Sequence, residues 1–223
     1  MQIDLNVVQL LSSRICHDLV GPIAAVNTGL ELMEEDSDDD GAALGLVTRS
    51  AREANRRLAF YRAAFGFGAA TSTAAGWKPA LDEARILAEG FLESGKVRLE
   101  WQDISADDNS PALPGAVKVV LNIILMASES LPRGGVIGLS FAKLDEGIGI
   151  GLTATGEGGA LREDLREALA EDAGMTKDVL SARNVNAYLA QCLARDLGAL
   201  IEHSEGPNGE IQLAALFPNA AGC

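Results

Sequence analysis

The residues best suited to chemistry stand in "SSRICHDLVGPIAAV", residues 12–26. His17 is followed directly by Asp18, and a carboxylate beside an imidazole can orient the ring and accept its proton while the other nitrogen forms a bond. Gly21 lies one turn further along on the same face of a helix, where the missing side chain leaves room for another molecule. Pro22 predicts a bend there, because its ring pushes against the carbonyl of Asp18. Together these residues indicate an accessible nucleophile on a bent helix.

The helix that carries His17 must present the imidazole outward. Apolar residues recur at steps of three or four from Leu5 to Met33, which predicts a helix of about thirty residues with one apolar stripe. His17 follows Ile15 of that stripe by two positions, which is about 200° around the helix. The imidazole is therefore expected to point away from the stripe, toward solvent or a partner.

A second helix is predicted from about residue 42 to residue 65, after a turn in the acidic segment "EEDSDDDG". Its apolar residues alternate steps of three and four, as in a heptad seam: Leu44, Val47, Ala51, Ala54, Leu58, Tyr61 and Phe65. Two long helices joined by a short turn pack antiparallel, and a lone hairpin leaves apolar surface exposed to water. We therefore expect a homodimer in which two hairpins form a four-helix bundle.

The segment "GAATSTAAG", residues 68–76, is typical of a linker and divides the chain into predicted domains 1–70 and 71–223. Beyond it the patterns predict helices near 79–94, 114–131, 161–171 and 184–197, and strands near 96–101, 135–144, 147–155, 199–204 and 210–217. The Asn-Gly of "EGPNG" favours a hairpin turn between the last two strands. The predicted class is α+β, with a helical hairpin followed by a mixed sheet covered by helices on one face.

Composition excludes several classes of partner and site. A net charge of −14 argues against a nucleic-acid surface, because phosphate backbones are bound by clustered Lys and Arg. The chain shows neither a secretion signal nor an apolar run long enough for a membrane helix, so a cytoplasmic location is expected. Cys16, Cys192 and Cys223 are too few and too widely spaced for a disulfide framework or a zinc site. No metal site is predicted.

The motif "HDLVGPI" resembles the phosphoacceptor box of sensor histidine kinases, which lies on the first helix of a dimeric hairpin. The resemblance implies that His17 carries a phosphoryl group, that Asp18 assists the transfer, and that receiver domains dock beside them, where Gly21 leaves space. Receivers cluster carboxylates around their phosphorylation site, so a basic stripe would steer them toward the hairpin. Four arginines are candidates for that stripe, although a charged face kept for solubility is the alternative: Arg14, Arg49, Arg52 and Arg56.

The residues from 77 onward resemble the ATP-binding domain of the same kinases, but the nucleotide contacts are missing. Met126 stands where that family places a magnesium-binding asparagine, and a thioether is a poor ligand for a hard cation. Ala154 stands where an aspartate reads the adenine, and alanine can accept no hydrogen bond from it. "SARNVNAYLAQCLARDLGA" enters its helix without the glycine-rich phosphate loop. We therefore expect no ATP or other cofactor on this chain, and the magnesium for transfer on the receiver.

A phosphoacceptor histidine on a kinase-like dimer with a disabled nucleotide domain resembles the ChpT-type histidine phosphotransferases of alphaproteobacteria. The resemblance implies a phosphotransferase that passes phosphate from the receiver of a hybrid histidine kinase, through His17, to the receivers of response regulators. An autophosphorylating sensor kinase and a dimeric scaffold that binds receivers without carrying phosphate are the alternatives. His203, in a predicted strand, has no partner of catalytic type and is expected to be structural.

Overall fold

The computed structural model describes residues 4–34, 40–66, 77–103, 114–170, 180–206 and 209–219. The predicted linker 68–76, the predicted domain boundary after residue 70 and most of the acidic turn lie outside these ranges. So do Cys223 and Asn208 of the predicted Asn-Gly turn. The predicted α+β class is confirmed, and most predicted helices and strands are present within a few residues of their expected bounds.

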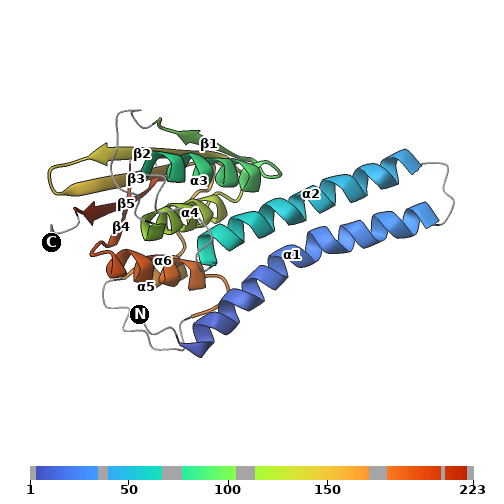
Figure 1. Ribbon diagram of the computed structural model, residues 1–223, viewed down its shortest axis with the longest axis horizontal. Coiled ribbons are helices and arrows are strands. Elements are labelled where there is room, and N and C mark those ends of the chain that lie inside the picture. Colours follow the sequence, from blue (N-terminus) through green and yellow to red (C-terminus); the bar gives the residue numbers. More distant parts are fainter. Residues whose placement is uncertain are drawn as a thin grey trace.

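Helices α1 (Leu5–Glu34) and α2 (Asp40–Phe65) form a long hairpin that projects from the rest of the molecule (Figure 1). Helix α1 continues through Pro22 as a single element of 30 residues. The two helices approach closely at Gly29, where an added Cβ would lie 2.6 Å from Val47 Cγ2 and 3.2 Å from the carbonyl oxygen of Ala43. The absence of a side chain at this glycine therefore permits the close packing of the hairpin.

The C-terminal region contains a five-stranded sheet with the strand order β1-β2-β3-β5-β4. Its strands are β1 (Val97–Trp101), β2 (Gly135–Lys143), β3 (Gly147–Thr155), β4 (Ile201–Glu205) and β5 (Ile211–Pro218). Strand β1 pairs with β2 in parallel, and the other three pairings are antiparallel. The predicted mixed sheet, including the antiparallel pairing of the last two strands, is confirmed.

One face of the sheet is covered by helices, as Figure 1 shows: α3 (Trp77–Leu92), α4 (Pro114–Glu129), α5 (Glu163–Leu169) and α6 (Val185–Asp196). Strand β5 alternates in burial, with Leu213 and Phe217 facing the helices and Ala214 and Leu216 exposed. This period of two is what a sheet with one solvated face requires. Helix α4 is the centre of the core, because every residue from 120 to 127 is buried.

The base of the hairpin is packed into this same core. Phe60, Tyr61 and Ala64 of α2 belong to the buried cluster that also contains residues of α3 and α4. Helix α4 also supplies donors to carbonyl groups at the C-terminal end of α2, which have no partner inside their own helix. Asn122 Nδ2 donates to the carbonyl of Ala64 at 3.2 Å, and Lys118 Nζ donates to the carbonyl of Gly66.

Across the described ranges, none of the helices has both the length and the apolar character needed to span a bilayer.

Candidate functional site

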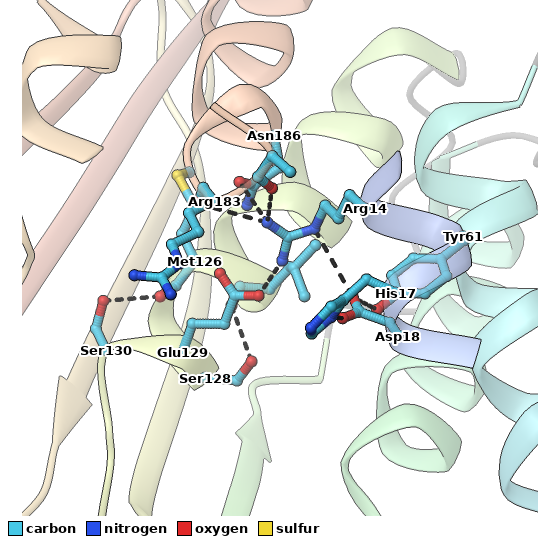
Figure 2. A network of polar contacts seen from close by, with 12 residues as sticks. Arg14, His17, Asp18, Tyr61, Met126, Ser128, Glu129, Ser130, Arg183 and Asn186 are labelled. Atoms are coloured by element: carbon cyan, nitrogen blue, oxygen red, sulfur yellow. Dashed lines mark hydrogen bonds and ion pairs between the residues drawn. The ribbon is translucent and has the colours of Figure 1, made fainter. Parts of the chain in front are cut away.

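His17 lies on the outward face of α1 with its side chain 88% exposed, as the helical pattern predicted. Its Nδ1 is 3.1 Å from Oδ1 of Asp18 (Figure 2). An ionised carboxylate can only accept hydrogen bonds, so in the neutral ring this contact requires the proton on Nδ1. Nε2 then keeps its lone pair free. The structure thus brings the two predicted catalytic residues together and leaves one ring nitrogen available as a nucleophile.

The carboxylate of Asp18 is held from the second helix. The hydroxyl of Tyr61 donates to Oδ2 of Asp18 at 2.6 Å, and Nε of Arg14 lies 4.0 Å from the same oxygen. Each carboxylate oxygen therefore has its own hydrogen-bond donor, His17 for Oδ1 and Tyr61 for Oδ2. The heptad pattern places Tyr61 in the apolar seam and does not predict this bond. The available signal was that a buried tyrosine hydroxyl usually needs a polar partner.

Tyr61 is itself buried, and that environment defines its protonation state. Burial, followed by the hydrogen bond to Asp18, raises the pKa of the Tyr61 hydroxyl well above its usual range. The hydroxyl consequently stays protonated at neutral pH and acts only as a donor toward the carboxylate.

Arg14 is placed differently from the prediction. It was expected on a surface that a receiver could contact, but only 5% of it is exposed. Its Nη1 donates to the carbonyl of Ala182 at 3.1 Å and to Oδ1 of Asn186 at 3.2 Å, and its Nη2 is paired with the carboxylate of Glu129 (Figure 2). The reason is that the Arg14 side of α1 faces the loop before α6. Arg14 therefore joins the hairpin to the C-terminal region and is not available to a partner in this structure.

The Arg14 joint, defined by Arg14, Glu129 and Asn186, is incompletely hydrogen-bonded. Burial raises the pKa of Glu129, and the nearby charge of Arg14 opposes that shift without cancelling it. Within the part of the chain that the structure describes, three buried atoms of the joint have no hydrogen-bond partner: Arg14 Nε, Glu129 Oε2 and Asn186 Nδ2. The joint therefore holds the hairpin against the C-terminal region, although the three unsatisfied buried atoms reduce the stability that it contributes.

The remaining predicted partner-binding residues lie on the surface of the hairpin. Arg49 and Arg52 are exposed on α2, and Arg56 forms a 2.5 Å ion pair with Glu93, after α3. Gly21 is exposed on α1, and an added Cβ would have no atom within 4 Å outside its chain neighbours and the backbone of its own helix. Space beside His17 is therefore open at Gly21, as the sequence indicated, whereas Arg14 is separated from the α2 arginines by its burial.

The two positions compared with nucleotide-binding residues are inside the core. Met126 on α4 is 0% exposed and Ala154 on β3 is 1% exposed. Asn122, one turn before Met126, directs its amide to the carbonyl of Ala64 at the base of the hairpin. These side chains support the packing between α4, the sheet and α2.

The loop before α6 has the opposite polarity from an anion-binding loop. Anion sites at helix N-termini present backbone N–H groups. Here the carbonyl oxygens of Ala182 and Arg183 point toward the guanidinium of Arg14, and the carbonyl of Arg183 also accepts from Arg162 at 3.0 Å. The loop therefore receives positive groups from the hairpin and from the segment before α5.

Comparisons with known proteins show that this chain is similar to phosphotransferases. The family model described as "Histidine phosphotransferase C-terminal domain" matches residues 81–209. The protein phosphotransferase ChpT of Brucella abortus (strain 2308) is 31% identical over 193 residues, which cover 86% of this chain and 87% of that protein. A solved structure of a bacterial phosphotransferase matches with a TM-score of 0.78 and 28% identity, covering 96% of this chain and 98% of that chain. The catalytic domain of the histidine kinase ThkA is more distant, with 15% identity and a TM-score of 0.47 over 62% of this chain and 88% of that chain.

Proposed function

Because this chain belongs to the histidine phosphotransferase family, we propose that it relays phosphate between receiver domains through His17. The donor is the receiver of a hybrid histidine kinase, and the acceptors are the receiver aspartates of response regulators in the cytoplasm. The observation that carries the proposal is the pairing of an 88% exposed imidazole with a carboxylate 3.1 Å from its Nδ1.

The proposed step begins with neutral His17 facing a phosphorylated receiver. The lone pair on Nε2 forms a bond to phosphorus, the bond from phosphorus to the receiver's aspartate oxygen breaks, and that aspartate leaves as a carboxylate. Positive charge develops on the ring, and the carboxylate of Asp18 stabilises it by accepting the hydrogen bond from Nδ1–H that is already present. The reverse sequence delivers the phosphoryl group to an acceptor receiver. Alignment of the three reacting atoms accounts for most of the rate, and the receiver supplies the magnesium.

We also infer that the phosphoryl group does not come from ATP. Met126 and Ala154 lie in the hydrophobic core, where neither offers an oxygen or nitrogen to magnesium or adenine. The loop before α6 directs carbonyl oxygens at Arg14, and such oxygens repel phosphate. These features favour a phosphotransferase over the alternative of an autophosphorylating sensor kinase.

We further propose that two copies pair through their hairpins into a four-helix bundle. Large apolar side chains on both helices are exposed in the single chain, several of them at the predicted stripe and seam positions: Val8, Ile23, Leu30, Leu44 and Leu58. An apolar groove of about 570 Å³ runs at the base of the hairpin between α1 and α2. Burying these residues against a second copy would remove them from water.

The central experiment compares two phosphate donors. The purified chain is incubated with a ³²P-phosphorylated receiver, and separately with γ-³²P-ATP and magnesium. We expect label on the wild-type chain from the receiver and none from ATP. His17→Gln should take up no label while still binding the receiver, and the control His203→Gln, in β4, should behave as wild type. Label from ATP would instead support the sensor kinase, and undiminished relay through His17→Gln would support the scaffold.

The proposed dimer is tested by light scattering on the intact chain. Leu58→Glu places a charge on the exposed seam of α2 and should give a monomer. Ile86→Glu is the matched control, because Ile86 is exposed on α3 outside the hairpin and its variant should remain dimeric. A wild-type protein that is monomeric at all concentrations would refute the bundle.

A further inference from the structure

The hydroxyl of Tyr61 is a buried polar group for which the proposed transfer step has no role. Tyr61 lies on α2, 43 residues from Asp18 in sequence, and its residue surface is 2% exposed. The chain has only one other tyrosine, Tyr188 on α6. The folding of the hairpin thus brings the hydroxyl of Tyr61, on α2, to Asp18 on the helix that carries His17.

The ring of Tyr61 is fixed by three aromatic neighbours. It stacks on Phe65 with centroids 5.5 Å apart and an interplanar angle of 8°. It meets Phe91 and Phe60 edge-on, at centroid distances of 5.9 Å and 6.0 Å. These contacts restrict the ring, and because the phenolic oxygen lies on the ring axis, they also restrict where the hydroxyl can be.

The carboxylate of Asp18 is held at one oxygen by this fixed hydroxyl and presents its other oxygen to His17. Tyr61 Oη donates to Oδ2 at 2.6 Å, whereas Oδ1 is 3.1 Å from His17 Nδ1. The carboxylate is planar, so fixing Oδ2 limits where Oδ1 can be. Arg14 Nε, at 4.0 Å from Oδ2, is too distant for a hydrogen bond. Of these two neighbours, only Tyr61 can hold Asp18 by a hydrogen bond.

The carboxylate of Asp18 does not need a protein partner for its solvation. Asp18 is 21% exposed, so water can reach it from the open face of α1. Without Tyr61, the side chain would rotate into solvent and spend less time beside the imidazole. The bond from Tyr61 therefore affects where the carboxylate points.

We propose that Tyr61 is a positioning residue for phosphoryl transfer, which holds Asp18 so that His17 keeps its proton on Nδ1 and offers Nε2 to phosphorus. The inference rests on the proposed function, and it adds a residue that touches neither the phosphoryl group nor the imidazole. The proton donated by Tyr61 stays on its oxygen throughout, since burial and the carboxylate both raise the pKa of the hydroxyl. The bonds formed and broken at phosphorus are unchanged.

The kinetic test uses Tyr61→Phe, which removes one oxygen and keeps the aromatic packing. In single-turnover transfer from a phosphorylated receiver, the maximal rate should fall about fivefold, as expected for one ordinary hydrogen bond. The half-saturating receiver concentration should change less than about twofold, because docking is untouched. Tyr188→Phe is the matched control. Its hydroxyl contacts Cys192 on α6, and its removal should leave both quantities as in wild type. An unchanged maximal rate in Tyr61→Phe would refute the proposal.

A double-mutant cycle shows whether Tyr61 acts through Asp18. Asp18→Asn alone should slow transfer, and adding Tyr61→Phe to it should cause no further loss, because the carboxylate to be positioned is already gone. If the two losses multiply, Tyr61 acts by another route and the proposal fails.

Nitrogen-15 NMR of the imidazole tests the same geometry without a receiver. The chain has two histidines, so His17 can be assigned with His17→Gln. Neutral His17 should be mainly the Nδ1–H tautomer in wild type, and Tyr61→Phe should shift the population toward Nε2–H. A wild-type ring with its proton mainly on Nε2 would contradict the positioning role. If the tautomers behave as expected but no receiver phosphorylates the wild-type chain, the proposed function fails while the positioning geometry stands.

Discussion

His17 and Arg14 lie one turn apart on α1, yet the imidazole is 88% exposed and the guanidinium is 5% exposed. The imidazole has one ring nitrogen bonded to its sequence neighbour, whereas Arg14 contacts groups from α4 and α6. One helix thus carries an open reactive face and a closed structural face. The charge of a residue near His17 therefore does not reveal whether a partner can reach it.

Helix α4, which was compared above with the metal-binding helix of kinases, has a structural role at the closed face. Three polar side chains of α4 contact the hairpin: Lys118 reaches Gly66, Asn122 reaches Ala64 and Glu129 reaches Arg14. Their spacing of four and seven residues places them on one side of the helix. The helix therefore holds the hairpin in place while the open face keeps its imidazole free.

The largest expected effect comes from opening the closed face with Arg14→Met. The change leaves the partly buried carboxylate of Glu129 without its cation and removes donors from the loop before α6, so the free energy of unfolding should fall by about 3 kcal/mol. Urea denaturation measures the loss, and Arg52→Met, at an exposed position, should change stability by less than about 0.5 kcal/mol. Equal stability of the two variants would contradict the structural role of Arg14.

A smaller loss of stability is expected from Asn122→Ala, which removes the side-chain amide that donates to the last turn of α2. The carbonyl of Ala64 is then buried without that bond, so unfolding should become easier by about 2 kcal/mol in the same denaturation experiment. Asn27→Ala is the control, because Asn27 is exposed on α1 and its truncation should cost less than about 0.5 kcal/mol. If Asn122→Ala instead matched its control, α4 would not hold the hairpin in the way described.

Gly21→Ala should act on the open face, where it should affect the docking of a receiver more than the stability of the fold. Helix interiors favour alanine over glycine, but the ring of Pro22 disfavours the helical conformation of a preceding residue that carries a Cβ, so the free energy of unfolding should change by less than about 1 kcal/mol. Receiver binding, measured by titration calorimetry, should weaken if the empty space is used for docking. Gly29→Ala, where the Cβ would meet Val47 at 2.6 Å, should destabilise the hairpin and serves as the contrasting control. Tighter receiver binding by Gly21→Ala would rule out this use of the space.

The smallest expected effect is a change in the pH dependence of stability at Glu129, one acid among 32 acidic residues. Burial raises its pKa in the folded state, so the folded chain binds more protons than the unfolded chain between the two pKa values. Glu129 therefore contributes stability at pH values below its unfolded pKa and loses that contribution as the pH rises through the raised value. Glu129→Gln should lack this decline when denaturation is repeated across that range. A parallel pH dependence in both proteins would show that burial does not control this carboxyl.

Local sequence patterns are enough to predict the helices, the strands and the outward direction of His17. Each depends on a local pattern: apolar steps of three and four place His17 opposite the stripe of α1, and alternation along β5 defines its buried face. The motif around His17 and Asp18 could be recognised from the sequence for the same reason, because the two residues are adjacent and their contact needs no other element.

The contacts of Arg14, Tyr61 and Glu129 depend on the tertiary structure. Their partners lie far away in sequence: Tyr61 is 43 positions from Asp18, and Arg14 is 115 positions from Glu129. The local sequence pattern around Arg14 would be the same whether its side chain faced a receiver or the loop before α6. Periodicity fixes the direction of a side chain around its own helix, but the neighbour it meets depends on how separate helices dock. That docking is set by the whole core, and no short segment of sequence specifies it.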